Sequence, residues 1–308
     1  MENRLIFFVF SCRLKVFSLT VLLCMVSFAF SQQPISAGQS INNLTPLNPA
    51  FSVIKQTGSV NFSAKKQWTG IQGAPGSVLF NVDTYLEGID ASVGVVGMNS
   101  KIGIENLNDA SVFIAKAVRL DGAHYLSASL NAGGSYFNAS YSRLDAFDPK
   151  FDTDIRQFSP TIGFGLMFYD PEKFYLGVSI PKLIFGKRDL SAEVNNSYNT
   201  WYFSGAYFIQ VNTDISIRPA GLLSYTPSQA SLLDLSAMVY LKKSIGLGLG
   251  YRSDNQISGI LNYIFNRRLS IGYSYQTSLG INNDGNVNIT AHEISLGYRF
   301  GASLSNML

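Results

Sequence analysis

Hydrophobic and polar residues alternate strictly in many segments of this chain. The segment AHEISLGYRF puts Ile294, Leu296, Tyr298 and Phe300 in the same phase as His292, and it puts Glu293 and Arg299 in the other phase. A period of two indicates a β-strand with two unlike faces. Such strands occur in soluble antiparallel sheets, with the apolar face toward the core, and in membrane barrels, with the apolar face toward lipid.

Other segments repeat the pattern at a length of about ten residues, which is the length of a barrel strand. RLSIGYSYQTSL, SIGLGLGYR and TWYFSGAYFIQV each separate large apolar residues from Gly, Ser and Gln. We expect an all-β fold, a transmembrane antiparallel β-barrel of the outer membrane with about fourteen strands (range about 12–16). The predicted strands begin near residues 58, 77, 90, 109, 123, 159, 173, 198, 214, 231, 245, 257, 268 and 290.

The predicted connections alternate between short and long, as in outer-membrane barrels with short periplasmic turns and longer extracellular loops. The short ones lie at residues 86–88, 121–122, 170–172, 212–213, 242–243 and 266–267. The long ones are TGIQGAPG, SKIGIENLN, RLDAFDPKFDTDIRQF, PKLIFGKRDLSAEVNNS, SYTPSQA, SDNQ and GINNDGNVN. This order places Trp68 and Trp201 near the long-loop rim. It also predicts an aromatic girdle near the other rim, made of Tyr169, Phe174, Phe208, Tyr240, Phe265 and Tyr298.

Composition and the N-terminus support an exported membrane protein. Charged residues make up 14% of the chain, against about 25% in an average soluble domain, and the net charge of +3 does not suggest nucleic acid as a partner. Residues 1–31 have basic residues, an apolar run and then Ser31-Gln32, which predicts a signal peptide cleaved after Ser31. The run is too short for a transmembrane anchor. Both cysteines lie in this leader.

Four motifs together resemble the PorP/SprF family of outer-membrane proteins of Bacteroidetes, which is associated with type IX secretion and gliding motility. They are LNPAF (Leu47 to Phe51), KKQWTGIQGAPGS (Lys65 to Ser77), GYSYQTSL (Gly272 to Leu279) and the closing HEISLGYRF. The resemblance covers about Gln33 to Phe300. The family residues carried over are structural or lumen-facing, with His292 at a strand end: Asn48, Pro49, Ala50, Lys65, Gln67, Trp68, Gln276, Glu293 and His292. This chain has Lys65 where the family usually has arginine and Gln276 where aspartate is common. Lysine keeps the charge but loses the planar fork of arginine.

The resemblance implies a role in the secretion or surface attachment of particular cargo proteins with a type B C-terminal sorting domain, gliding adhesins among them. The implied partners are outer-membrane lipid, this cargo, and periplasmic or other secretion-system subunits. We predict four regions: the signal peptide (1–31), an N-terminal segment that would plug the lumen (32–57), the barrel (58–300) and a C-terminal tail (301–308). A FadL-like or passive transporter, with Asn48-Pro49-Ala50 inside the lumen, and a structural barrel that tethers the membrane to the cell wall are the alternatives.

The sequence does not favour an enzyme, a cofactor or a metal site. His124 follows a short turn, whereas His292 begins a strand at the opposite rim, so the two histidines do not share a site, and no Gly-x-Ser-x-Gly motif is present. Four aspartates, Asp145, Asp148, Asp152 and Asp154, lack the central glycine of a twelve-residue calcium loop, and a solvated acidic loop explains them better. Asp284-Gly285 is typical of a turn.

The ends of the barrel predict one specific contact. If the strand from Gly58 to Trp68 pairs with that from Thr290 to Phe300, Lys65 and Glu293 lie seven residues from the same rim, in the inward phase of adjacent strands. Opposite charges so placed can pair across strands and would fix the register of closure. Alternatively, each residue merely lines a polar lumen.

Overall fold

The computed structural model describes residues 40–68, 70–143, 154–184, 199–227, 229–279 and 290–301. The chain divides into two compact units, residues 1–32 and 33–308, and all described residues belong to the second. In these ranges the chain forms fifteen strands: β1 (Gly58–Gln67), β2 (Gly76–Leu86), β3 (Ala91–Ile102), β4 (Glu105–Arg119), β5 (Tyr125–Ala139), β6 (Ile155–Asp170), β7 (Phe174–Ile184), β8 (Trp201–Tyr207), β9 (Ile209–Gln210), β10 (Ile215–Tyr225), β11 (Leu232–Leu241), β12 (Ile245–Arg252), β13 (Gln256–Phe265), β14 (Leu269–Ser278) and β15 (Thr290–Phe300). The same ranges contain three short 3-10 helices: η1 (Pro49–Phe51) before β1, η2 (Glu87–Ile89) between β2 and β3, and η3 (Tyr141–Arg143) after β5.

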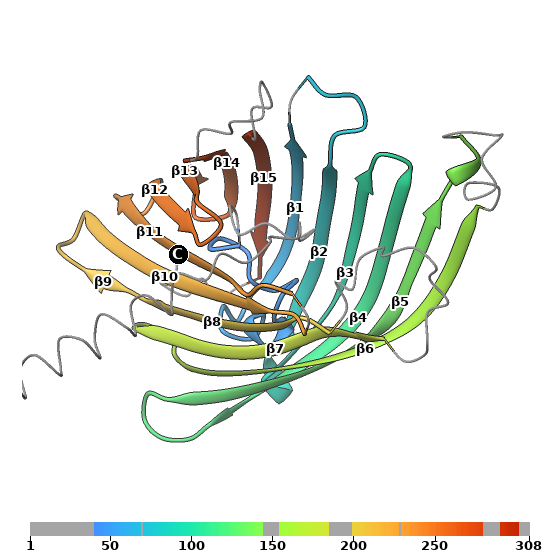
Figure 1. Cartoon of the computed structure of the whole chain (residues 1–308). Coiled ribbons are helices and arrows are strands. Elements are labelled where there is room, and N and C mark those ends of the chain that lie inside the picture. Colours follow the sequence, from blue (N-terminus) through green and yellow to red (C-terminus); the bar gives the residue numbers. More distant parts are fainter. Residues whose placement is uncertain are drawn as a thin grey trace, which may run out of the picture. The chain divides into compact units, whose positions relative to one another are not determined.

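The strands form one closed antiparallel barrel in which neighbours in sequence are neighbours in space (Figure 1). Closure comes from β1, which pairs with β15 from Gly58↔Phe300 to Gln67↔Ala291. Strands β8 and β9 act as one strand. Their register on β10 is continuous from Ala220↔Ala206 to Ile217↔Ile209, and the interruption lies opposite Pro219, which has no N–H to donate. The barrel therefore has the predicted fourteen membrane-crossing strands. Each begins within four residues of its predicted start, the largest differences being residue 109 against Glu105 and residue 159 against Ile155.

The two phases of each strand lie on opposite surfaces of the barrel. In β12, Ile245, Leu247 and Leu249 are exposed, Leu249 by 75%, whereas Gly246 is buried and Gly248 is half-buried. In β15, Ile294, Leu296 and Tyr298 are exposed and Glu293 is buried. A soluble protein rarely exposes so continuous an apolar surface, but a membrane barrel requires one. This result confirms the predicted orientation of the apolar phase.

The two ends of the barrel differ. We call one end the turn rim, formed by residues 87–90, 120–124, 171–173, 211–214, 242–244 and 266–268, and we call the opposite end of the strands the loop rim. Both chain ends of the barrel, Gly58 and Phe300, lie at the turn rim, as predicted. The prediction of a long loop at Ser100–Asn108 is wrong. Strands β3 and β4 pair as far as Ile102↔Glu105, and Gly103, with a φ of 58°, allows a two-residue turn. The connection between β12 and β13 is also short, residues 253–255.

The aromatic residues follow the prediction in part. Trp68 and Trp201 lie at the loop-rim ends of β1 and β8, and Phe265 and Tyr298 are exposed near the turn rim. Tyr169 and Tyr240 are not part of an outer girdle, because each is in the inward phase of its strand and only 2% exposed. They support the interior instead.

The described residues directly before β1 lie in the barrel interior. We call Ser40–Thr57 the inner segment. It contains η1, and most of its residues are buried. Its side chains form two apolar clusters with the wall, one around Leu44, Leu47 and Phe51 and one around Ile41. Among the described residues no helical segment has the length and hydropathy that a membrane crossing demands.

Candidate functional site: the inner segment and the barrel interior

Apolar contacts position the inner segment against β6, β7, β8 and β10. Leu44, Leu47, Ala50, Phe51 and Ile54 pack with wall residues of the inward phase: Met167, Tyr169, Tyr175, Tyr202, Ala206 and Leu222. The ring of Phe51 meets that of Tyr175 edge to face, with centroids 5.3 Å apart, a favoured geometry for two aromatic rings. On the other side, Ile41 packs with Met238, Tyr240, Ile260 and Ile264. The inward tyrosines are thus a surface for this segment.

Asn48 is the polar centre of these contacts. Its Oδ1 accepts a hydrogen bond from the Ala50 N–H at 3.1 Å and so caps η1. Its Nδ2 donates to the carbonyl oxygens of Leu166 at 3.1 Å and Val178 at 3.5 Å, which are paired residues on β6 and β7. Pro49 begins η1, where the missing N–H costs nothing. Asn-Pro-Ala therefore forms a capped turn that is hydrogen-bonded to two strands.

Two wall glycines make room for this turn. A Cβ on Gly165 would lie 2.2 Å from Asn48 Oδ1, and one on Gly177 would lie 2.9 Å from its Nδ2. Two serines complete the attachment. Ser127 Oγ donates to the Ala50 carbonyl at 2.9 Å, and Ser179 Oγ donates to the Leu47 carbonyl at 2.7 Å. All of these wall residues belong to β5, β6 and β7, so one sector of the barrel holds the turn.

The beginning of the inner segment is held by a second polar group on β10 and β11. Arg218 donates from Nη2 to Asn42 Oδ1 at 2.8 Å and to the Tyr240 hydroxyl at 2.5 Å, and that hydroxyl donates to Asn42 Oδ1 at 3.2 Å. The guanidinium also lies over the Tyr240 and Phe208 rings. Arg218 is only 4% exposed, and these contacts offset the cost of burying its charge.

Charged residues gather in the interior toward the loop rim. Arg252 forms a two-pronged ion pair with Asp254, with both nitrogen–oxygen distances at 3.0 Å, and its Nε lies 4.0 Å from Asp234. Lys65 is buried and interacts electrostatically with Glu293, Arg252 and both aspartates. Asp234 and Arg252 also line a cavity that opens to solvent and extends to Ile41 and Leu44 of the inner segment. The interior thus has apolar, hydrogen-bonded contacts in one sector and an ionic group beside a cavity in another.

The structure brings together some of the sequence-predicted residues. Lys65 and Glu293 are direct cross-strand partners at the seam, which confirms the predicted register, and both are buried. Gln276 is a buried neighbour in this sector and lines the same cavity as Asp234. Asn48, Pro49 and Ala50 lie apart from this group, on the inner segment.

The other predicted residues lie near the loop rim. Gln67 is half-buried at the end of β1, and Trp68 follows it with a φ of 48°. His292 is in the outward phase, where its Nδ1 lies 2.8 Å from the Tyr273 hydroxyl. Ser31 and Gln32, at the predicted cleavage site, lie outside the described residues, as do Asp145, Asp148, Asp152 and Asp284.

Sequence reasoning missed Arg218, Asp234 and Arg252. The alternation in sequence predicts that their side chains point inward, and charged residues that point inward indicate polar contacts inside the barrel. Their contacts could not be predicted from the sequence, because Arg218 meets Asn42 and Tyr240, and Arg252 meets Asp234, only in the folded barrel. Gly165 and Gly177 were missed for the same reason.

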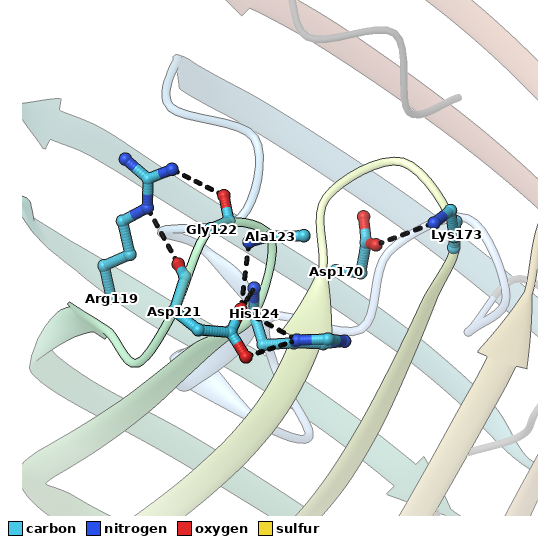
Figure 2. Close-up of polar contacts among 7 residues, drawn as sticks. All are labelled: Arg119, Asp121, Gly122, Ala123, His124, Asp170 and Lys173. Atoms are coloured by element: carbon cyan, nitrogen blue, oxygen red, sulfur yellow. Dashed lines mark hydrogen bonds and ion pairs between the residues drawn. The ribbon is translucent and has the colours of Figure 1, made fainter.

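The turn rim contains a further polar arrangement, which Figure 2 shows. Asp121 Oδ1 accepts hydrogen bonds from the N–H groups of Ala123 and His124, each at 3.0 Å, and its carboxylate lies 2.9 Å from His124 Nδ1. These bonds lower the pKa of the Asp121 carboxyl to about 2. The His124 ring stacks on Phe168. The aspartate thus orders the turn, and Asp170 and Lys173 form an ion pair at the next turn.

The two histidines are at opposite rims, as predicted: His124 precedes β5 at the turn rim, and His292 is the third residue of β15 at the loop rim. Within the described ranges, no group of three or more His, Cys, Asp or Glu side chains has the spacing of a metal site. Asp154, the described member of the predicted acidic loop, instead accepts hydrogen bonds from Ser142.

Solved structures with a similar fold are outer-membrane channels and porins. The chain superimposes on the monoaromatic hydrocarbon channel CymD with a TM-score of 0.50 and 12% identity, over 86% of this chain and 93% of that one. The Pseudomonas putida toluene transporter TodX gives 0.48 and 9% over 89% and 99%, and the Acinetobacter baumannii outer membrane protein Omp33 gives 0.47 and 9% over 80% and 100%. At these identities the likeness concerns the fold alone. A comparison with curated proteins gave no match.

A family model described as type IX secretion system membrane protein PorP/SprF matches residues 29–298. The match spans the inner segment and nearly all of the barrel, so it includes both the turn at Asn48 and the ionic group at the seam. The chain belongs to the PorP/SprF family of type IX secretion system membrane proteins.

Proposed function

We propose that this protein is an outer-membrane accessory barrel of type IX secretion that is needed for the secretion or surface attachment of specific cargo. The cargo would be a protein with a type B C-terminal sorting domain, such as a gliding adhesin. In this proposal residues 1–31 are removed after export, the turn rim faces the periplasm, and the loop rim faces the outside of the cell. Family membership and the barrel fold support the proposal.

The attachment of the inner segment to the wall is the observation that favours cargo handling over conduction. Asn48 bonds to β6 and β7, Ser127 and Ser179 bond to the backbone of the segment, and Arg218 holds Asn42. A segment with this many partners is costly to displace, because each buried group would lose its hydrogen bond. We therefore propose that Ser40–Thr57, within the predicted region 32–57, plugs the lumen and that partners bind at the two rims.

A FadL-like or passive transporter is the second candidate. One observation favours it: a cavity between the inner segment and the wall, lined by Pro46, Pro49, Leu79, Val96, Met98 and Pro181 together with the Lys182–Asp109 ion pair. Apolar side chains with a few polar groups among them are the usual lining of a small-molecule site.

Deletion of the gene separates the two candidates. The deletion strain should lose one or a few proteins from the cell surface, measured by mass spectrometry of surface-labelled cells, while uptake of a small dye and of a long-chain fatty acid stays at the parental level. Complementation with the wild-type gene should restore the lost proteins. Lost uptake with an intact surface proteome would instead establish the transporter.

A further inference from the structure

A row of polar and cationic residues crosses the outer surface of the barrel next to the loop rim. Direct cross-strand partners form it: His292 with Lys66, Lys66 with Gly76, Gly76 with Lys101, and Lys101 with Asn106. Lys66 and Lys101 are exposed. They share the phase of Phe62 on β1 and Val95 on β3, both of which face outward. The two lysines therefore project from the same outer surface.

Gly76 leaves a gap between the two lysines. They lie two strands apart, which corresponds to a Cα separation of roughly 10 Å, and the residue between them has no side chain. A Cβ built on Gly76 has one neighbour within 4 Å, the Lys65 carbonyl oxygen at 3.6 Å, so the position is open outward. An anion the size of a phosphate group can lie over Gly76 and contact both ammonium groups.

The surface beside this gap, toward the turn rim, is apolar. On β2 and β15 the next outward residues are exposed hydrophobics, and on β1 Phe62 follows beyond the half-buried Ala64; the exposed residues are Phe62, Val78, Phe80, Ile294 and Leu296. Cations beside an exposed apolar surface match a ligand that has an anionic head and hydrocarbon chains. Lysines at the edge of a hydrocarbon band also need a polar environment, because a charge within the hydrocarbon is costly.

The outward phase of these strands has no opposing charge. In β15, β1, β2, β3 and β4, which are described in full, no outward residue is Asp or Glu. The nearby carboxylates are in the inward phase: Glu105 accepts from the Tyr141 hydroxyl, Asp109 pairs with Lys182, and Glu293 is buried. The neighbouring polar groups include His292 beside Tyr273 and the linked amides of Asn99, Asn106 and Asn108. The outward surface is thus cationic, which favours an anionic ligand over a cationic one.

We propose that Lys66 and Lys101 bind the phosphorylated headgroup of a membrane lipid over Gly76, with the acyl chains along Phe62, Val78 and Phe80. This inference needs only the membrane barrel. The leaflet depends on the proposed orientation, in which the loop rim meets the outer leaflet and the lipid is its phosphorylated glycolipid, lipid A. Clusters of basic residues beside a membrane commonly bind anionic headgroups, with a gain in affinity of about fivefold for each Lys or Arg.

Native mass spectrometry of the purified full-length mature barrel tests the proposal, with bisphosphorylated lipid A, dephosphorylated lipid A and inorganic phosphate as probes. We expect wild type to retain bisphosphorylated lipid A and to release the dephosphorylated form, with no displacement by free phosphate. The double variant Lys66→Gln/Lys101→Gln should bind about 30-fold more weakly, which is about 2 kcal/mol at 1.4 kcal/mol per tenfold. The double variant Lys242→Gln/Lys243→Gln removes the same charge at the turn rim and should bind as wild type does.

Gly76→Val provides a second variant that keeps both charges. It fills the gap with a residue that favours strands, so it should fold and still weaken binding. Gel mobility before and after heating verifies folding of every variant. Equal binding by the two double variants, retention of dephosphorylated lipid A, displacement by free phosphate, or unchanged binding by Gly76→Val would each overturn the proposal. Failure of the lipid proposal would not count against the proposed cargo function, because the surface-protein assay tests that function separately.

Discussion

The contact between Asn48 and Gly165 allows a quantitative test of how the inner segment is held. Asn48→Ala removes the cap on the Ala50 N–H and the two bonds to Leu166 and Val178. At about 1 kcal/mol for each neutral hydrogen bond, and with less weight for the 3.5 Å bond, the variant should lose roughly 2–3 kcal/mol of unfolding free energy.

Gly165→Ala perturbs the same contact from the wall. Its methyl group would lie 2.2 Å from Asn48 Oδ1 and 2.8 Å from Ser129 Oγ, and such overpacking typically costs about 1–3 kcal/mol. In the Asn48→Ala background the closest contact is absent, and the Ser129 side chain can rotate away. The double variant should therefore be about 1–2 kcal/mol more stable than the sum of the single effects predicts, as for residues in direct contact.

Guanidinium unfolding of the purified barrel, followed by tryptophan fluorescence, measures all four proteins of the cycle. Gly259→Ala is the matched control, because a Cβ on Gly259 has no neighbour within 4 Å, and it should change the free energy of unfolding little. Additivity of the Asn48 and Gly165 effects within about 0.5 kcal/mol would refute the contact.

Three further predictions concern the seam, the orientation and the turn rim. A double-mutant cycle of Lys65→Ala and Glu293→Ala should show a coupling of about 1 kcal/mol in the free energy of guanidinium unfolding, because the two residues are buried cross-strand partners. Strict additivity of the two effects would contradict the pairing. On whole cells a membrane-impermeant thiol reagent should label Gln72→Cys at the loop rim and not Glu172→Cys at the turn rim. Reversed labelling would invert the proposed orientation. Asp121 has a lowered pKa of about 2, so its charge stabilises the fold above the ordinary pKa of Asp and this contribution is lost as the pH falls toward 2. Urea unfolding at a series of pH values should show the stability difference between wild type and Asp121→Asn shrinking between about pH 4 and pH 2, whereas a constant difference would show that the charge has no role.

The alternation of apolar and polar residues determined the strands of this protein and their phase, and closure of the barrel then determined the pairing at the seam. A period of two is a local property of the backbone, so Ile245, Leu247 and Leu249 could be assigned outward without knowing any neighbour. Closure then left one antiparallel partner for the first strand, and counting residues from the rim placed Lys65 opposite Glu293. The short polar turns predicted that consecutive strands pair with each other, which gives the order of the strands in the barrel.

Only the tertiary structure decided what occupies the interior. Asn48 contacts residues 118 and 130 positions away, and no local pattern specifies such partners. The alternation that assigned the faces of β12 did not assign the positions of Tyr169 and Tyr240, because an aromatic residue near a rim can face either the lipid interface or a packed interior. Burial against the inner segment resolved them. The hairpin at Gly103 was missed because Asn106 and Asn108, two polar residues of β4, resemble a loop in sequence. Its two-residue turn is possible because Gly103 adopts a positive φ.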